Sequence, residues 1–249
     1  MKVLVLGHKG MLGHMVHKYL LEKEKESMLD SILEVRTINL RWPSREFKKK
    51  LLDFDGNFVV NCIGAIHQRT DDFDVNTELP IWLDKNLDNC GVIHPGTDCE
   101  IDDDNYGNSK RRAAEYILER GRVTKIIKTS IIGPELNSKA SLLEWFLHSE
   151  GEVFGYSKAY WNGNTTLQWA KLCYKLMWEW HKSDNLIIPT TECISKYDLL
   201  NEIKEVYSKD IKITKKLDIE MNKCLVGNLN TPTINEQLKE IKKYKSEEL

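Results

Sequence analysis

Long hydrophobic runs are missing from this chain of 249 residues. No stretch approaches the roughly 20 consecutive apolar residues that a membrane-spanning helix needs. The apolar run within residues 1–7, MKVLVLG, is too short for the core of a secretory signal and leads directly into a glycine-rich turn. We therefore expect a cytoplasmic protein that neither crosses nor binds a membrane.

An excess of charge of either sign is also missing. Lys and Arg together number 36 and Asp and Glu 38, which gives a formal net charge of −2. This balance does not favour nucleic acid or an anionic membrane as a partner. Charged residues make up 30% of the chain and hydrophobic residues 41%, as in ordinary globular proteins. The length suits one domain, or one domain with a small lobe.

Metal-binding cysteine spacings are the third absence. The chain has six cysteines, but none form a CxxC or a related pattern. We expect no bound metal, and we interpret the cysteines as scattered reduced thiols, as is usual in the cytosol. They are Cys62, Cys90, Cys99, Cys173, Cys193 and Cys224.

The first half of the chain alternates compact apolar runs with amphipathic segments. Residues 2–6, KVLVL, predict a buried strand, and from Met11 apolar residues recur at the i, i+4 spacing of a helix. This alternation predicts an α/β fold with a doubly wound parallel sheet. The further strands expected are 34–40, 58–64, 91–96 and 125–133, and the further helices are 45–52, 76–89 and 106–120.

After Pro134 the pattern changes, but no long linker or internal repeat separates the two parts. We therefore expect a single domain, with residues 1–133 as the main core and 134–249 as a small C-terminal α/β lobe. Ser195 is the expected N-cap of one helix in this lobe. The lobe is expected to contain helices at 141–148, 167–181 and 195–207, a loop at 155–166, a strand at 185–190 and a charged surface helix from Thr233.

A glycine-rich turn joins the first strand to the first helix. Gly7, Gly10 and Gly13 form a GxxGxxG pattern. Glycines at these places permit a sharp turn, close approach of a pyrophosphate to the backbone, and tight packing of helix on sheet. Free N–H groups at the start of the helix favour the phosphates. The pattern indicates a dinucleotide site; the alternative is a purely structural turn.

The end of the second predicted strand bears on the choice of cofactor. An acid there would bind the ribose hydroxyls of NAD, whereas a basic residue favours the phosphate of NADP. Residues 38–41 read INLR and contain no acid, while Arg36, Arg41 and Arg45 are close in sequence and Lys9 lies within the glycine turn. We therefore expect NADP and leave NAD open. The alternative is that these are solvated surface charges.

Tyr106 and Lys110 form a YxxxK pair, which places both side chains on one face of a helix. An ammonium group near a phenol favours the phenolate and brings the phenol pKa toward the working range of an acid or base. The hydroxyl of Thr97, after the preceding strand, could bind a carbonyl oxygen. The alternative is an exposed tyrosine and lysine at the start of a helix.

These motifs, in this order, resemble the extended short-chain dehydrogenases/reductases, which have a Rossmann-like fold. Within them the chain most resembles the dTDP-4-dehydrorhamnose reductase-like family of sugar-nucleotide reductases. The glycine turn also resembles that of GDP-fucose synthases, which are NADP enzymes with a basic residue there. The matching segments, over roughly the first 200 residues, are GHKGMLG at 7–13, VVNCIG at 59–64, VN at 75–76, IHPGTDC at 93–99, YGNSK at 106–110, KTSIIGPE at 128–135 and YWNGNTTLQWAK at 160–171.

The resemblance implies a role for each matching position and a nucleotide-sugar as substrate, and it is compatible with a homodimer. Thr97 would polarise the carbonyl, Tyr106 would supply the proton, and Lys110 would orient tyrosine and ribose. The implied pyrophosphate residues are Gly7, Gly10, Met11, Leu12 and Gly13. Those beside the adenosine ribose are Lys9, Asn39, Leu40 and Arg41, and those lining the cofactor are Cys62, Ile63 and Gly64. The candidates for substrate binding are Asp98, Lys158, Trp161 and Asn162, although Trp161 could equally be a core residue.

Two features depart from the family pattern. Gly96 stands where a hydroxyl residue is usual, and only residues 99–105 separate Thr97-Asp98 from Tyr106, where the family has a longer flap. Residues 102–104 place three aspartates in this short segment, and negative charge disfavours the phenolate and repels a diphosphate. The segment is consistent with a trimmed lid, a different substrate or a lost activity.

Three functions follow. The first is reduction of a keto group on a nucleotide-sugar. The second is a non-catalytic dinucleotide-binding subunit, as in the regulatory subunit of methionine adenosyltransferase, which the retention of Thr97, Tyr106 and Lys110 argues against. The third is an epimerase or dehydratase with tightly bound NAD, in which Thr97 and Asp98 would provide the extra acid and base.

Overall fold

The computed structural model describes residues 1–26 and 33–246, and the chain divides into two compact units. The first comprises Met1–Lys128 and Ala170–Ile187, and the second Thr129–Trp169 and Ile188–Leu249. The first unit therefore includes residues 170–187, which the predicted division at residue 133 assigned to the C-terminal lobe. Residues 170–187 belong to the first unit because they contain most of one of its helices and the edge strand of its sheet.

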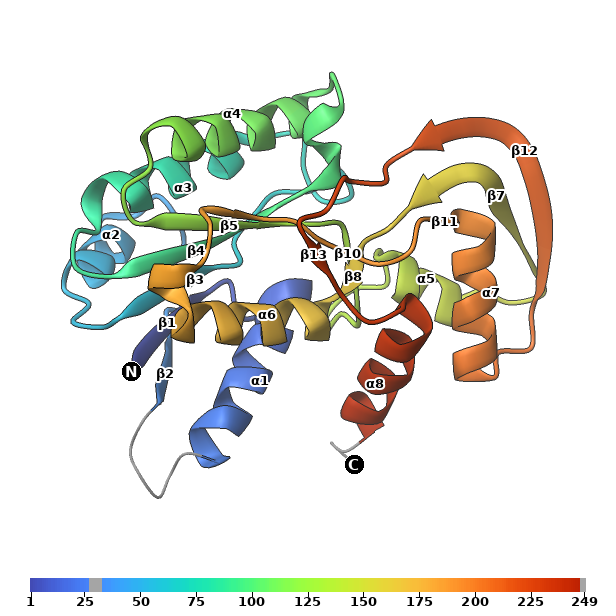
Figure 1. Cartoon of the computed structure of the whole chain (residues 1–249), viewed down its shortest axis with the longest axis horizontal. Coiled ribbons are helices and arrows are strands. Elements are labelled where there is room, and N and C mark those ends of the chain that lie inside the picture. The colour runs from blue at the N-terminus through green and yellow to red at the C-terminus, as the bar shows by residue number, and fades with distance from the viewer. Residues whose placement is uncertain (27–32, 247–249) are drawn as a thin grey trace. The chain divides into compact units, whose positions relative to one another are not determined.

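The first unit is built on a six-stranded sheet, in which every strand pair is parallel and the order is β2-β1-β3-β4-β5-β9 (Figure 1). The alternation in the sequence therefore gave the correct fold class. The strands are β1 (Lys2–Leu6), β2 (Glu34–Thr37), β3 (Phe58–Asn61), β4 (Gly91–Gly96), β5 (Thr124–Lys128) and β9 (Leu186–Ile187). The helices are α1 (Met11–Glu26), α2 (Arg45–Leu52), α3 (Asp74–Asn86), α4 (Asn105–Arg120) and most of α6 (Thr166–Trp178), with short 3₁₀ turns η1 (Asp98–Ile101) and η2 (Trp180–Lys182).

Helices cover both faces of this sheet, with α2, α3 and α4 on one side and α1 on the other (Figure 1). The central strands are consequently buried on both faces, and Val3, Val5, Val59 and Val60 are fully inaccessible to solvent. Burial on both faces explains why these strands read as continuous apolar runs rather than alternating ones.

The carboxyl ends of β1, β3 and β4 lie next to one another, because these strands are neighbours in a parallel sheet. The glycine turn follows β1, Cys62 follows β3 and Thr97 follows β4. Ligands of open α/β sheets bind at this edge. The sheet thus gathers three of the predicted site segments that are far apart in the sequence.

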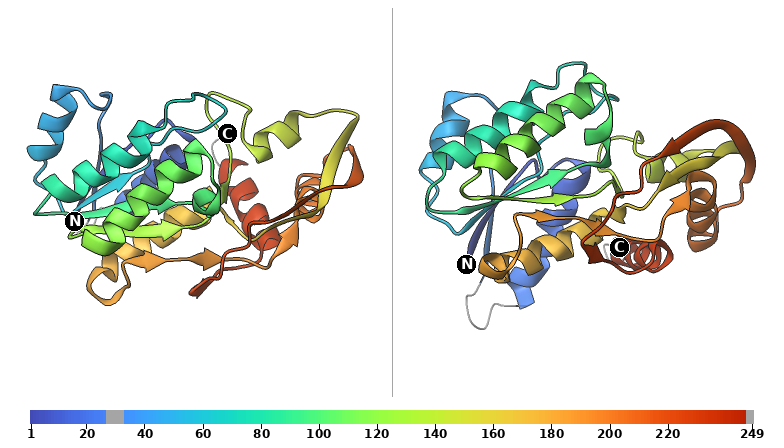
Figure 2. Two further views of the ribbon diagram at one scale, coloured as in Figure 1. Left: turned by 90° about the horizontal axis from the view of Figure 1, so that it is seen from above. Right: turned by 45° about the horizontal axis from the view of Figure 1, so that its top comes forward.

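The second unit has its own core, in which α7 packs on β7 (Figure 2). Its sheet has the order β11-β7-β12, and two further strand pairs are β6-β8 and β10-β13. The strands are β6 (Ile131–Ile132), β7 (Glu152–Trp161), β8 (Asn164–Thr165), β10 (Pro189–Thr190), β11 (Ile194–Ser195), β12 (Lys212–Asn222) and β13 (Leu229–Asn230). The helices are α5 (Leu142–His148), α7 (Lys196–Tyr207) and α8 (Ile234–Ser246).

Three sequence predictions for this unit meet different outcomes. Ser195 caps α7 as expected, since its hydroxyl accepts the Asp198 N–H at 3.0 Å. The predicted loop at 155–166 is wrong: most of it is strand β7, in which Val153 and Ala159 are buried while Phe154 is exposed, the alternation of a half-buried strand. Helix α8 is more than a surface helix, because its apolar face lies in the core.

The cysteines also differ from the expectation of free thiols throughout. Cys193 and Cys224 form a disulfide with their Cα atoms 5.9 Å apart. The pairing joins the loop before β11 to the segment after β12, a proximity that a sequence separation of 31 does not reveal. Cys62, Cys90, Cys99 and Cys173 are free.

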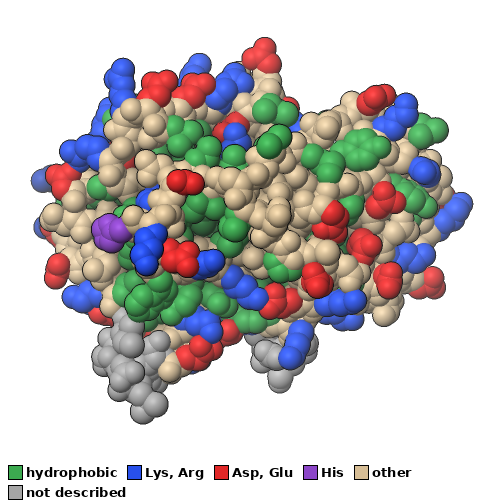
Figure 3. All heavy atoms as spheres, viewed as in Figure 1, with side chains coloured by type: hydrophobic (Ala, Val, Ile, Leu, Met, Phe, Trp, Pro, Cys, Tyr) green, Lys and Arg blue, Asp and Glu red, His purple; other side chains and the backbone are tan. Residues whose placement is uncertain are grey.

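Charge distribution, metal ligands and helix hydropathy can be described for the same residues. Acidic and basic side chains are interspersed over the face shown in Figure 3, in keeping with the small net charge. Within residues 1–26 and 33–246, no group of three or more His, Cys, Asp and Glu side chains is placed to hold a metal ion. None of the helices in the same ranges has the length and apolar character required to span a bilayer.

Candidate dinucleotide and catalytic site

The glycine turn is shaped so that side chains do not fit at two of its positions. Gly7 has a φ of +73°, and a Cβ there would lie 2.9 Å from the carbonyl carbon of Cys62. A Cβ on Gly13 would lie 2.1 Å from the carbonyl oxygen of Gly7. The first position needs glycine for its conformation, and the last for the close packing of α1 on the turn. The turn therefore presents bare backbone at the start of a 16-residue helix.

Lys9 and Asn39 meet at the ends of β1 and β2. The Lys9 ammonium donates to Oδ1 of Asn39 at 3.0 Å, and both side chains are exposed. Arg41 is exposed beside them. Arg36 instead donates to the Glu34 carboxylate at 2.6 Å. The structure thus places Lys9 next to Asn39 in the 38–41 segment. Their binding of the adenosine ribose stays a prediction. Arg36 is instead paired with Glu34.

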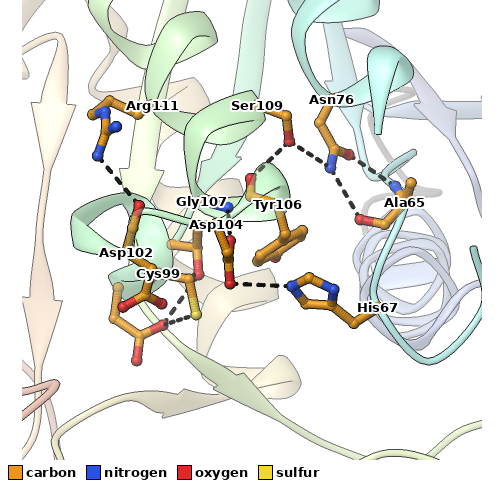
Figure 4. Close-up of polar contacts among 12 residues, drawn as sticks. Ala65, His67, Asn76, Cys99, Asp102, Asp104, Tyr106, Gly107, Ser109 and Arg111 are labelled. Carbon is orange, nitrogen blue, oxygen red and sulfur yellow. Dashed lines mark hydrogen bonds and ion pairs between the residues drawn. The ribbon is translucent and has the colours of Figure 1, made fainter. Parts of the chain in front are cut away.

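Two buried asparagines fix the segment that follows β3. Asn61 accepts the Ile63 N–H at 3.1 Å and donates to Nδ1 of His94 at 3.1 Å. Asn76 accepts the Ala65 N–H at 2.8 Å and donates to the Ala65 carbonyl at 3.0 Å (Figure 4). The same amide donates to Oγ of Ser109 at 3.2 Å. Asn76 therefore links the loop after β3 to helix α4.

Thr97 is the N-cap of η1 and its polar groups all have partners. Its hydroxyl donates to Oδ1 of Asp98 at 3.1 Å and accepts the Cys99 N–H at 3.2 Å. Its backbone N–H donates to Oε1 of Glu100 at 3.0 Å. Glu100 in turn forms an ion pair with Lys128, with 2.7 Å between Oε2 and Nζ. A buried acid thus orients the threonine backbone.

The Glu100–Lys128 pair also accounts for Gly96, the departure from the family pattern. A Cβ on Gly96 would lie 2.9 Å from Cβ of Lys128 and 3.0 Å from Oε1 of Glu100. A hydroxyl residue would therefore collide with the side chains that hold Thr97. In this chain glycine at position 96 makes room for the ion pair.

Tyr106 lies in the first turn of α4, with its ring among polar and aromatic neighbours (Figure 4). The Thr97 side chain lies beside its phenol, and hydrogen bonding between the two lowers the pKa of the phenol. Its ring centroid lies 5.2 Å from that of His67 and 5.7 Å from that of Phe73. Its backbone carbonyl accepts the Ser109 hydroxyl at 2.7 Å. The structure therefore brings Tyr106 and Thr97 together, as the motif order predicted.

The acidity of Tyr106 differs from the prediction. Burial raises the pKa of its phenol well above the ordinary range, and the nearby Cys99, Asp98 and Glu100 raise this pKa further. The hydrogen bond to Thr97 opposes these effects. The sequence led us to expect that Lys110 would bring this pKa down. That expectation is wrong here because burial dominates.

Lys110 is buried, with 7% of its surface exposed. Its ammonium donates to the Pro95 carbonyl at 3.3 Å, and a Cβ on Gly64 would lie 3.8 Å from Nζ. Burial lowers the pKa of Lys110 to about 8, while Glu100 and Cys62 act in the opposite direction. Lys110 thus reaches the edge formed by the ends of β3 and β4, beside the predicted cofactor-lining residues.

The short aspartate-rich segment folds into η1 and the N-cap of α4. A Cβ on Gly107 would lie 2.4 Å from the Cys99 carbonyl oxygen, so α4 packs directly on this turn. Asp104 lies 3.3 Å from Nε2 of His67, and Asp103 is 3.9 Å from the guanidinium of Arg111. The His67 imidazole and the Arg111 guanidinium therefore face part of the charge that the sequence concentrates before Tyr106.

The predicted substrate residues of the C-terminal lobe lie in the second unit. Trp161 is 1% exposed and belongs to its core. Asn162 donates to the Leu225 carbonyl and accepts the Leu225 N–H, both at 2.9 Å. Lys158 faces Glu220 at 3.4 Å. Trp161 and Asn162 thus support the unit's own packing, and substrate binding by these three residues stays a prediction.

Three residues of the site had no role in the sequence analysis. Asn76 lies in the matching segment VN, but the match does not indicate that its side chain binds Ala65 and Ser109. His67 carries no spacing signal, because it acts on Tyr106, which only the fold brings near. The pairing of Glu100 with Lys128 likewise depends on the fold. A buried acid three residues after a threonine does fit a capping box, which was the available signal for Glu100.

Comparisons by sequence alone give no match, either to protein-family models or to curated proteins. Solved structures do match. A dTDP-4-dehydrorhamnose reductase from Bacillus anthracis, solved in complex with NADP, superposes with a TM-score of 0.77 at 12% identity over 98% of this chain and 99% of its own. A dTDP-4-dehydrorhamnose reductase from Clostridium acetobutylicum gives 0.69 at 17% over 99% and 100%. A dTDP-glucose 4,6-dehydratase from Bacillus anthracis, in complex with NAD, gives 0.73 at 13% over 100% and 97%. The chain therefore has the fold of the extended short-chain dehydrogenases/reductases that act on sugar nucleotides.

Proposed function

We propose that this protein reduces a keto group on a nucleotide-sugar, with NADPH as the preferred cofactor and Tyr106 as the proton donor. The observation that carries the proposal is the placement of the Tyr106 phenol beside the Thr97 side chain, at the same sheet edge as the glycine turn. Two hydroxyl groups that meet in this way form a pair of donors for one carbonyl oxygen.

The residues present fit a dinucleotide. At Gly7 and Gly13 any Cβ would collide with backbone, so only glycine allows the tight turn that leads into α1, and the first N–H groups of a helix favour phosphates. Lys9 would face the phosphate on the adenosine ribose, and Lys110 would hold the nicotinamide ribose. A bound nicotinamide would supply the hydride for the carbonyl carbon.

The raised pKa of Tyr106 bears on the protonation of its phenol. A phenol whose pKa lies above its ordinary range stays protonated at neutral pH, so Tyr106 would carry the proton that the carbonyl oxygen needs. Thr97 would orient that oxygen. Burial disfavours the phenolate that the reverse oxidation would need.

A second candidate is a dinucleotide-binding subunit without activity. It is favoured by the Thr97 hydroxyl, which donates to Asp98 and would have to turn away from it to bind a carbonyl oxygen. The two functions differ in one measurable respect, because both predict cofactor binding and only the reductase predicts turnover.

The test is oxidation of NADPH by the purified full chain with a panel of 4-keto-6-deoxy nucleotide-sugars. We expect substrate-dependent loss of NADPH absorbance. Cofactor binding without turnover on any member of the panel would instead support the non-catalytic subunit. Sugar products are identified by NMR.

The cofactor preference is tested by Lys9→Glu. We expect the dissociation constant for NADPH to rise about 10- to 100-fold, since a hydrogen bond to a charged group contributes roughly 1.5–3 kcal/mol and each 1.4 kcal/mol is tenfold. Binding of NADH should change little, because it lacks the phosphate. Lys50→Glu, on the exposed face of α2, makes the same change of charge and is the control. Equal weakening of NADPH and NADH would contradict the assignment.

A further inference from the structure

An aromatic cluster lies beside Tyr106. His67, in the segment between β3 and α3, has its ring centroid 5.2 Å from that of Tyr106 and 4.9 Å from that of Phe73. Phe73 in turn lies 5.7 Å from Tyr106. The planes are tilted or edge-on, the geometry that aromatic pairs prefer. Two side chains from one loop thus define the space available to the phenol ring.

Asp104 holds the His67 ring in place. One of its carboxylate oxygens accepts the Gly107 N–H at 2.6 Å and caps α4, while the other lies 3.3 Å from Nε2 of His67 (Figure 4). Because Tyr106 lies in the first turn of this helix, the same aspartate fixes both the start of the helix and the ring that faces Tyr106. His67 and Asp104 are each about half exposed, 49% in both cases.

The backbone and the hydroxyl of Tyr106 have other supports. The Ser109 hydroxyl donates to its carbonyl, and the Thr97 side chain lies near its hydroxyl. Neither determines how the ring between them is turned. The rings of His67 and Phe73 pack against it. A small misplacement of a reacting group is costly, since roughly 1 Å can reduce a rate about 100-fold.

We propose that His67 is a positioning residue, whose ring, held by Asp104, sets the orientation of the Tyr106 phenol. The effect on turnover rests on the function proposed above. The effect on the Tyr106 ring does not, which allows the two to be tested separately.

The kinetic test compares His67→Ala, Asp104→Ser and the double variant. Serine is a good N-cap but is too short to reach His67, so Asp104→Ser keeps the cap of α4 and removes the contact. We expect each single variant to lower kcat about tenfold with KM unchanged. This loss is smaller than the roughly 100-fold cost of a misplacement by about 1 Å, because the phenol of Tyr106 would be only partly misplaced. The kcat of the double variant should be no lower than that of the slower single variant, because both substitutions disrupt the same contact between His67 and Asp104. His67→Phe keeps a ring but cannot bind Asp104, so its kcat should match that of Asp104→Ser.

Asp103→Ser is the matched control, since it removes a neighbouring charge that does not face His67 and should leave kcat unchanged. Thermal unfolding establishes that each variant is folded. If His67→Ala does not fold, His67→Phe takes its place in the comparison. Independent effects that multiply in the double variant, or losses confined to KM, would overturn the proposal.

A second measurement does not depend on turnover. Fluorine NMR of protein labelled with fluorotyrosine gives one signal for each of the nine tyrosines, and Tyr106→Phe identifies that of Tyr106. We expect His67→Ala and Asp104→Ser to shift this signal in the same direction, and Asp103→Ser to leave it in place. An unshifted signal would overturn the positioning role whether or not the protein turns over. A shifted signal in a protein without turnover would support positioning while the proposed function fails.

Discussion

Tyr106→Phe should reduce turnover by roughly 100- to 10,000-fold, the usual contribution of a positioned general acid. The phenylalanine keeps the ring that packs against His67 and Phe73 and removes only the hydroxyl that lies beside Thr97. The proton for the carbonyl oxygen then has no donor. Steady-state NADPH oxidation measures the loss, and calorimetry should show unchanged cofactor binding.

The control for this variant is Tyr116→Phe. Tyr116 lies on the same helix, where its ring faces the ammonium of Lys85 at 5.1 Å, away from Thr97. We expect its rate to equal that of the unaltered protein. Substantial activity in Tyr106→Phe would refute the role of the phenol, and a matching loss of cofactor affinity would indicate a binding role instead.

Glu100→Ala should lower the free energy of unfolding by about 3 kcal/mol, the lower end of what removing one partner of a buried ion pair costs. The Glu100 side chain is 6% exposed and that of Lys128 19%. The substitution leaves the Lys128 ammonium without its partner and the Thr97 N–H without its acceptor. Urea denaturation followed by circular dichroism measures the change, and turnover should fall with the loss of order at Thr97.

Two further variants separate charge from hydrogen bonding. Glu100→Gln combined with Lys128→Met retains an acceptor for Thr97 and removes both charges, so it should recover most of the stability, because a buried pair replaced as a whole is often neutral. Glu115→Ala, an exposed acid on α4, should change stability by less than about 0.5 kcal/mol. An effect of Glu100→Ala as small as that of Glu115→Ala would contradict a structural role for the ion pair.

The sequence patterns predicted the first unit well because its signals are local. A strand buried on both faces is a continuous apolar run, and an amphipathic helix repeats every three to four residues, so β1, α1 and α2 follow from neighbouring residues alone. The second unit was harder. Strand β7 contains glycine and several aromatic residues, and its alternation was masked by a composition typical of loops.

The site divides in the same way. The sequence identified Gly7, Gly13, Thr97, Tyr106 and Lys110 as candidates, because a turn, a cap and an i, i+4 pair are each set within a few residues. The pKa of Tyr106 was not, since it depends on burial, and burial is a property of the whole packing.

The sequence by itself thus determined the α/β alternation, the glycine turn and the order of the candidate site motifs, all of which are encoded by short-range spacing. The tertiary structure alone decided which distant groups act on them. It paired Glu100 with Lys128, joined Cys193 to Cys224, and placed His67 and Asp104 around Tyr106. The physical reason is that ion pairs, disulfides and ring contacts depend on distances in space, which follow only from how strands, helices and loops pack together.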